Sequence, residues 1–132
     1  MSEKLTLGFS PCPNDCFIFD AMIHGKIDTE GLAFDVVMDD VESLNKKAFE
    51  NKINITKLSY HAYAYLTDEY ILLDAGSALG KGCGPLVVES SKFKVQSWDN
   101  DTKVAIPGKL TTANFLFSLA YPQCGNKTEM VF

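Results

Sequence analysis

Short apolar runs alternate with polar, turn-forming stretches along this chain, and each run is long enough for only one strand or one short helix. Strands are predicted at residues 5–9, 32–38, 53–58, 70–73, 85–88, 102–107 and 128–132. Helices are predicted at residues 16–23, 41 to about 50, 60–66 and 113–120. Strands and helices alternate with short connections, which indicates an α/β fold with a mainly parallel sheet.

The stretch from Ser10 to Asp15 joins the first predicted strand to the first predicted helix. Its two prolines stiffen the connection, Asn14 is the predicted N-cap, and Asp15 places a negative charge in the first turn. Gly25 is predicted to end the helix, which reads as buried because its residues 16–23 are largely apolar. In α/β folds, turns at the carboxyl ends of strands are where ligands bind. The alternative to a ligand-binding turn is a loop that is stiffened by prolines and only leads into the helix.

The later helices also carry capping signals. Asp39 and Glu42 have capping-box spacing ahead of the second helix. Ser59 is the natural N-cap of the third helix, and either Thr111 or Thr112 caps the fourth.

Three strand-to-helix turns therefore carry polar groups: residues 10–15, 57–59 and 109–112. Helix N-termini offer unpaired N–H donors and a partial positive charge. Lys57 adds a full charge, and the hydroxyls of Ser59 and the two threonines add donors. Such a set predicts a site for the carboxylate or phosphate of a small ligand. The alternative for each turn alone is a helix cap beside a solvated lysine.

Composition narrows the class of protein. The chain has 132 residues, 46% hydrophobic and 22% charged, with a net charge of −5, as expected for a globular domain. It has no basic run that could follow nucleic-acid phosphates and no apolar run of membrane-spanning length. The first residues lead into a strand without a signal-peptide core. We therefore predict a cytoplasmic protein with no nucleic-acid or membrane partner.

The cysteines and histidines carry no metal signature. Cys12, Cys16, Cys83 and Cys124 include no pair with zinc-finger spacing, so free thiols are predicted, without metal or cofactor. His61 follows Ser59 closely and could act as a base, but packing or surface exposure is the more common role for such a histidine. His24 lies at a helix C-terminus, where a cation suits the helix dipole.

Several motifs resemble, in order, the 1,4-dihydroxy-6-naphthoate synthases of the futalosine route to menaquinone. They are residues 8–15, 39–45, 56–60, 78–88 and 104–108, followed by 111–113. The resemblance covers nearly the whole chain. It implies a periplasmic-binding-protein-like (type II) fold with the ligand in a cleft between two lobes. The lobes would be residues 1–90 and 103–132, joined by a connection at 91–102.

The resemblance also implies which residues contact the carboxylate substrate. They are Lys57, Leu58, Ser59, Thr112 and Ala113, with Thr111 as an additional candidate. The first polar turn, found from the residues alone, adds Ser10, Asn14 and Asp15 as further candidates in the cleft.

This chain departs from the family in two ways. Cys16 stands where the family usually has threonine, and family members are about twice as long. Their catalytic histidine lies in a later stretch, beyond Phe132, and neither His24 nor His61 matches it. We therefore expect the amino-terminal half of such an enzyme, with most of lobe one and only the start of lobe two.

Two functions remain open. One is a lyase, or a fragment of one, that opens cyclic dehypoxanthinyl futalosine to release 1,4-dihydroxy-6-naphthoate. The other is a non-catalytic module of the same fold that binds a small carboxylate. Because strand edges would lack neighbours in an incomplete fold, we also predict a homodimer with residues 103–132 in its interface.

Overall fold

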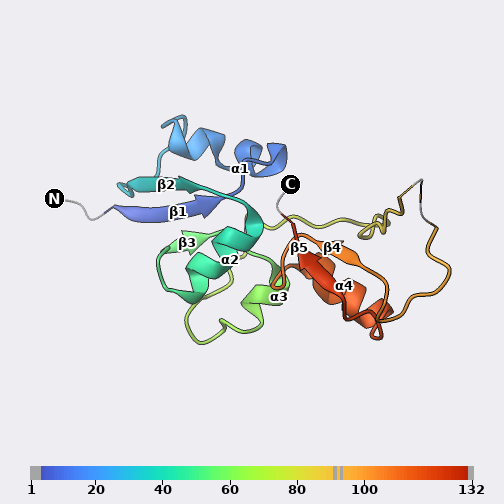
Figure 1. Ribbon diagram of the computed structural model, residues 1–132. Helices are drawn as coiled ribbons and strands as arrows, with labels where there is room; N and C mark the ends of the chain where they lie inside the picture. The colour runs from blue at the N-terminus through green and yellow to red at the C-terminus, as the bar shows by residue number, and fades with distance from the viewer. Residues whose placement is uncertain (1–3, 91, 93, 131–132) are drawn as a thin grey trace. The chain divides into compact units, whose positions relative to one another are not determined.

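A computed structural model describes residues 4–90, 92 and 94–130, and it is a mixed α/β structure with small parallel sheets (Figure 1). The chain divides into two compact units, Met1–Ala78 and Leu79–Phe132. The elements in order are β1 (Leu5–Phe9), α1 (Pro13–Ile23), β2 (Phe34–Met38), α2 (Val41–Phe49), β3 (Ile55–Thr56), α3 (Tyr60–Tyr63), β4 (Val104–Ile106), α4 (Thr112–Ala120) and β5 (Lys127–Glu129). The predicted lobe boundaries at residues 90 and 103 stay a prediction.

The first unit is built on a three-stranded sheet of order β2-β1-β3, in which β1 pairs in parallel with both neighbours. Leu7 and Phe9 are fully buried, and the Phe9 ring stacks on Phe19 of α1 at 4.8 Å. A Cβ atom at Gly8 would approach Leu44 of α2 to 3.0 Å, so α2 covers the opposite face of β1. Helices therefore pack on both sides of this small sheet (Figure 1).

The first helix begins earlier than the sequence predicted. Cys12, and not Asn14, is the N-cap residue, and Pro13 occupies the first helical position, where its missing N–H costs nothing. Gly25 ends the helix as predicted, with a φ of +63°, and the amide of Lys26 donates to the Ala21 carbonyl at 2.8 Å.

The prediction that this helix is buried was wrong. Its only buried residue is Asp15, whereas Phe17 is 87% exposed. The apolar residues are spread around the whole helix, so a sheet packed on one side covers only some of them.

The second helix is capped by Asp40 and not, as the capping-box spacing predicted, by Asp39. The Asp40 carboxylate accepts from the amides of Glu42 and Ser43 at 2.9 and 3.0 Å. Asp39 instead forms an ion pair with Lys47 at 2.8 Å.

The third strand and third helix are present but shorter than predicted. The strand covers Ile55–Thr56 and the helix Tyr60–Tyr63, after which the chain continues in turns toward the buried Leu66. Ser59 is the N-cap, as predicted, and its hydroxyl accepts from the Ala62 amide at 3.4 Å.

The second unit has a parallel pair of strands, β4 and β5, and the helix α4 between them in sequence. Thr111 is the N-cap of α4, which settles the choice between the two threonines. The last strand covers Lys127–Glu129, one residue earlier than predicted at its start, and residues 131–132 of that prediction lie outside the described chain.

The predicted strands at residues 70–73 and 85–88 do not form. Residues 70–73 belong to no sheet, and Ile71 is 89% exposed. Residues 85–88 likewise join neither sheet, and Leu86 is 88% exposed. Both runs have strand-forming sequences, but a strand also requires a neighbour with which to share its backbone hydrogen bonds.

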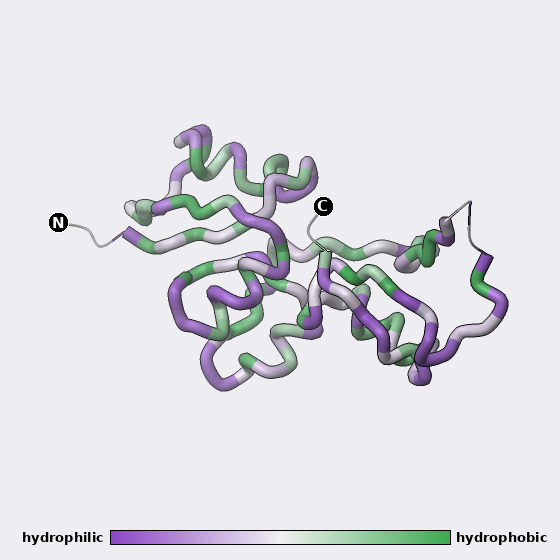
Figure 2. Tube along the Cα trace, viewed as in Figure 1, coloured by the Kyte–Doolittle hydropathy of each residue, from purple (hydrophilic) through white to green (hydrophobic). Residues whose placement is uncertain are grey.

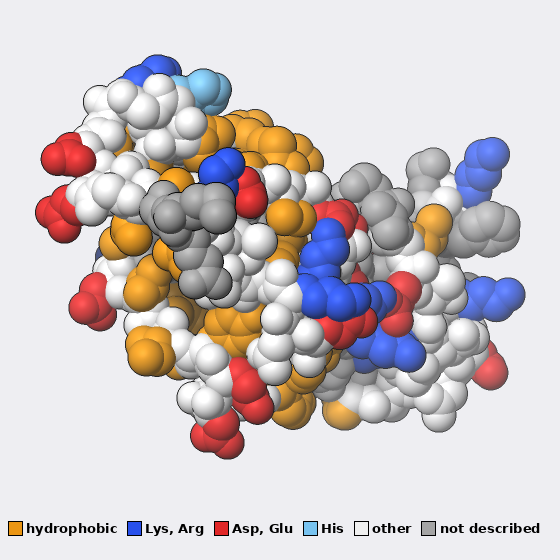
Figure 3. All heavy atoms as spheres, turned by 90° about the vertical axis from the view of Figure 1, so that its left-hand side faces the viewer, with side chains coloured by type: hydrophobic (Ala, Val, Ile, Leu, Met, Phe, Trp, Pro, Cys, Tyr) orange, Lys and Arg blue, Asp and Glu red, His pale blue; other side chains and the backbone are white. Residues whose placement is uncertain are grey.

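Hydrophobic stretches along the chain are short and interrupted by hydrophilic residues (Figure 2). Within the part of the chain that the structure describes, no helix combines the length and the apolar character needed to span a membrane. Apolar side chains also reach the surface at several places on the face shown in Figure 3.

Candidate functional site

The carboxyl ends of β1 and β3 bring two of the predicted polar turns together. Because the two strands are adjacent and parallel, the turn after β1 (residues 10–15) and the turn after β3 (residues 57–59) leave the same edge of the sheet. The Lys57 amide donates to the Gly8 carbonyl at 2.8 Å, which fixes the start of the second turn against the first strand.

Asp15 organises the first turn. Its carboxylate is 5% exposed and accepts from both the amide and the hydroxyl of Ser10, at 3.1 and 2.7 Å. Asn14, which is exposed, donates to the same carboxylate at 3.2 Å. A buried carboxylate that accepts several hydrogen bonds holds its donors in place. Ser10, Asn14 and Asp15 therefore form one hydrogen-bonded group, and their place in a ligand cleft stays a prediction.

Lys57 links the two turns to a third segment. Its ammonium lies 3.6 Å from the Asp15 carboxylate and donates to the Gly76 carbonyl at 2.6 Å. The next residue along that segment, Ser77, shares a 2.7 Å hydrogen bond with the Tyr60 hydroxyl. The sequence treated Lys57 as a charge available to a ligand, and the structure shows that Asp15 partly balances this charge.

Asn45 is a site residue that sequence reasoning missed. It is fully buried on α2, its side-chain NH₂ donates to Ser59 Oγ at 3.1 Å, and its side-chain oxygen accepts from the Ser59 amide at 3.0 Å. The sequence does contain a signal for Asn45. It lies four residues after Val41, on the helix face that carries the apolar stripe Val41, Leu44 and Ala48. A polar residue on a buried stripe needs a partner, and here the partner is Ser59.

These contacts fix the hydroxyl group of Ser59. Its oxygen accepts from the Ala62 amide and from Asn45, so both lone pairs of the hydroxyl are used. The contacts hold the half-buried hydroxyl in one position on the turn. A fixed hydroxyl and an ammonium on the same turn favour a ligand with negative charge, such as a carboxylate.

The turn after β2 adds acidic groups near the start of α2. Partial burial raises the pKa of the Asp40 carboxyl, but hydrogen bonds from the Ser43 hydroxyl and amide and from the Glu42 amide outweigh this effect and leave that pKa lowered. Glu42 is 5% exposed and accepts from Asn45 at 3.4 Å. Asp40 is thus a structural cap that is ionised at neutral pH.

The third predicted turn, residues 109–112, lies in the second unit. Thr111 is 3% exposed, and its hydroxyl donates to the Gly108 carbonyl at 2.7 Å while accepting from the Asn114 amide at 3.3 Å. Its proton is therefore engaged within the turn. Thr112 and Ala113 form the first turn of α4 and are half-buried, and their contact with substrate stays a prediction, as does that of Leu58.

Each histidine contacts a side chain four residues away in the sequence. His24 lies 3.0 Å from the Asp20 carboxylate at the end of α1, and His61 packs edge-on against Tyr65 at 5.6 Å. The four cysteines are free thiols, and Cys124 is buried. Among the residues that the structure describes, no three metal-ligating side chains converge.

Comparison with known proteins gives consistent matches. A family model described as menaquinone biosynthesis matches residues 5–131. A 1,4-dihydroxy-6-naphthoate synthase of Thermus thermophilus is 50% identical over 117 residues, and one of Streptomyces coelicolor is 38% identical over 121 residues. The crystal structure of protein AF1704 from Archaeoglobus fulgidus superposes with a TM-score of 0.88 at 43% identity and covers 99% of this chain.

The matches cover most of this chain but less than half of each relative. Each synthase match includes 89% of this chain but only 42% of the Thermus protein and 40% of the Streptomyces protein. The chain likewise covers 47% of AF1704. It therefore spans less than half the length of the relatives that it matches.

Proposed function

Because this chain belongs to the menaquinone biosynthesis family, we propose that it forms the substrate-holding part of a 1,4-dihydroxy-6-naphthoate synthase. The reaction is the opening of cyclic dehypoxanthinyl futalosine with release of 1,4-dihydroxy-6-naphthoate, which is a lyase reaction. We further propose the two-lobed, periplasmic-binding-protein-like fold. The parallel sheet of the first unit, with helices on both sides, is compatible with such a lobe.

The observation that carries this proposal is the turn at residues 57–59, at the carboxyl end of β3. Asn45 and the Ala62 amide fix the Ser59 hydroxyl there, and the same turn carries the Lys57 ammonium. A carboxylate accepts from a hydroxyl and is attracted by an ammonium. The substrate and the product of the proposed reaction each carry a carboxylate.

In this proposal the described residues bind and orient the substrate and do not supply the base. General-base catalysis needs a group with a pKa near neutral at the reacting carbon. His24 is held by Asp20 and His61 by Tyr65, and the family resemblance places the histidine base later in the sequence. Binding and chemistry are therefore assigned to different parts of the family's sequence.

Two assays on the purified chain test this proposal. Calorimetry with 1,4-dihydroxy-6-naphthoate should show saturable binding, and absorbance after addition of cyclic dehypoxanthinyl futalosine should show no product. The Thermus thermophilus synthase serves as the positive control for turnover. Turnover by this chain alone would assign the base to His61 or another group present here, and absence of binding would remove the carboxylate site.

A further inference from the structure

Asp15 and Lys57 form an ion pair at the sheet edge that carries the proposed substrate site. The Asp15 carboxylate lies 3.6 Å from the Lys57 ammonium, and the two side chains are 7% and 21% exposed. The side chains of the ion pair between Lys4 and Asp35, at the amino ends of β1 and β2, are 58% and 61% exposed. Because water and salt screen a partly buried charge weakly, Asp15 acts on any charged group that contacts Lys57.

Lys57 can still donate hydrogen bonds although its charge is balanced. An ammonium has three N–H donors, and the Gly76 carbonyl accepts from one of them at 2.6 Å. The 3.6 Å separation from Asp15 exceeds the length of a hydrogen bond, so this contact balances charge without using a donor. The Lys57 ammonium therefore offers a ligand hydrogen bonds more than net positive charge.

The turn after β2, together with helix α2, adds no surplus positive charge among its described residues. Strand β2 is parallel to β1 and adjacent to it, so the turn after β2 leaves the same sheet edge. The Lys47 ammonium lies 2.8 Å from the Asp39 carboxylate, and the Lys46 ammonium lies 3.9 Å from that of Glu42. The Asp40 cap is a further carboxylate, ionised at neutral pH. Each of the three lysines therefore has a carboxylate partner.

From these observations we infer that Asp15 is a specificity-determining residue, which restricts the proposed substrate site to binding groups with one negative charge. The inference rests on the proposed function. A carboxylate and a phosphate monoester both accept hydrogen bonds, but the phosphate carries a charge of about −1.5 to −2 at neutral pH. Its second charge would face Asp15 without a cation to balance it, which is unfavourable in a partly buried site. Asp15 thus selects the carboxylate from the two groups that the sequence left open.

The two carboxylate oxygens of Asp15 have different partners, so its charge can be removed without removing its structural contacts. Oδ2 accepts from the amide and the hydroxyl of Ser10, whereas Oδ1 faces Asn14 and Lys57. Asparagine at this position keeps an oxygen for Ser10 and removes the negative charge beside Lys57. The exposed Asn14 side chain can turn its own oxygen toward the new NH₂ group. Asp15→Asn is therefore a test of charge.

The test compares two naphthalene ligands that differ in charge, 2-naphthoate and 2-naphthyl phosphate. Calorimetry at a pH of about 7.5 should show that the native chain binds the carboxylate about tenfold more tightly, or better. Asp15→Asn should reduce this ratio of affinities by about tenfold or more, because the phosphate gains more than the carboxylate when the negative charge is removed. Asp35→Asn is the matched control, since it makes the same change of charge at an exposed ion pair, and it should leave the ratio unchanged.

A second measurement uses only the native chain and decides the matter if Asp15→Asn does not fold. The second pKa of a phosphate monoester is about 6, so 2-naphthyl phosphate becomes singly charged in mild acid. The native chain should bind it more tightly as the pH falls from about 7.5 to about 5.5. The charge of 2-naphthoate is constant over this range, so this ligand is the reference for changes in the protein itself.

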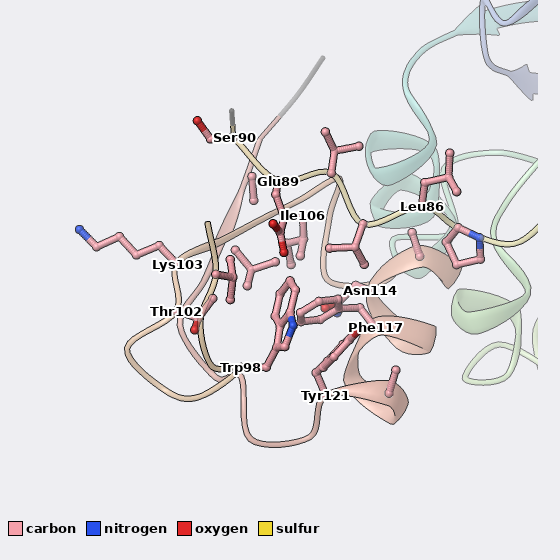
Figure 4. Close-up of a pocket in the computed structure, with 18 of the residues that line it drawn as sticks. Leu86, Glu89, Ser90, Trp98, Thr102, Lys103, Ile106, Asn114, Phe117 and Tyr121 are labelled. Atoms are coloured by element: carbon pink, nitrogen blue, oxygen red, sulfur yellow. The ribbon is translucent and has the colours of Figure 1, made fainter. Parts of the chain in front are cut away.

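Both ligands could also enter the apolar pocket of the second unit. Its volume is about 1040 Å³, and it contains the rings of Trp98, Phe117 and Tyr121, with centroids 4.5 to 5.9 Å apart (Figure 4). Trp98 is the single tryptophan of the chain, so its fluorescence reports binding there. Affinities for that pocket should not respond to Asp15→Asn.

The outcomes separate this inference from the proposed function. Failure of 2-naphthoate to bind would remove the carboxylate site of the proposed function and this inference with it. Binding of 2-naphthoate together with equally tight binding of the phosphate dianion would overturn the inference alone. So would a ratio that Asp15→Asn leaves unchanged, an equal change of the ratio in Asp35→Asn, or phosphate binding that does not tighten in acid.

Discussion

The two compact units differ sharply in how much apolar surface they bury. In the described part of Met1–Ala78, the buried apolar residues are Leu7, Phe9, Leu44, Ala48, Ile53, Ala62 and Leu66. In the described part of Leu79–Phe132 they are Ile106 and Cys124. A parallel sheet closes a core when helices cover both of its faces, which the first unit achieves with α1 and α2. The second unit has similar elements but too few of them.

Replacing a phenylalanine by alanine in each unit should reveal the difference in buried apolar surface most strongly. Phe9→Ala removes a fully buried ring that stacks on Phe19, and it should lower the free energy of unfolding by about 3–5 kcal/mol. Phe117→Ala should cost less than half as much, because the Phe117 ring is half-exposed. Urea unfolding followed by amide exchange in each unit measures both. Phe17→Ala, at an 87% exposed ring, is the control, and equal losses for all three variants would contradict the comparison.

Ligand binding provides a second comparison, between the hydroxyls of Ser59 and Thr112. We predict that Ser59→Ala and Thr112→Ala each weaken substrate binding by about 1.5–3 kcal/mol if the partner is charged. Both variants are made in a chimera in which the Thermus thermophilus residues outside its match continue this chain. Calorimetry with 1,4-dihydroxy-6-naphthoate measures the effect, with Thr29→Ala in the loop between α1 and β2 as a control hydroxyl variant. Unchanged affinity in both variants would discard the carboxylate site.

The buried amide of Asn45 should matter more than a half-exposed amide of the second unit. Asn45→Ala leaves the Ser59 amide without its acceptor and should destabilise the first unit by about 1–3 kcal/mol. Asn114→Ala removes a bond to the Lys109 carbonyl and one from the Lys127 ammonium, but the Asn114 side chain is half-exposed, so the loss should be smaller. Thermal unfolding compares the two variants. A smaller loss for Asn45→Ala would show that the Ser59 cap does not depend on it.

Helix caps give the smallest effect and add a dependence on pH. Asp40→Ala should cost about 0.5–2 kcal/mol at neutral pH, as should Thr111→Ala. The folded-state pKa of Asp40 is lowered, so its stabilisation is complete above the ordinary carboxyl pKa and is lost as the pH falls through the lowered value. The cost of Asp40→Ala should therefore shrink in acid, whereas that of Thr111→Ala should not. Unfolding free energies measured at several pH values decide this.

Patterns that act locally were predictable from the sequence. The strand at Leu5–Phe9, the caps at Ser59 and Thr111, and the ending of α1 at Gly25 each depend on a few neighbouring residues.

What was missed depends on residues far apart in sequence. Asn45 and Ser59 meet only after α2 and β3 have packed, so no local pattern pairs them. The runs at 70–73 and 85–88 have the local preference for strands and lack the neighbours that would realise it. The exposure of Phe17 likewise depends on which side of α1 the sheet covers, because apolar residues surround the whole helix.

We propose that the turns at the carboxyl ends of the first unit's strands hold the substrate's carboxylate through Ser59. Amide NMR of the chain during titration with 1,4-dihydroxy-6-naphthoate tests it most directly. Saturable shifts are expected at the amides of Ser59, Tyr60 and Ala62, and these shifts should be lost in the Ser59→Ala variant. Shifts confined to the second unit, or shifts at these amides that persist in Ser59→Ala, would contradict it.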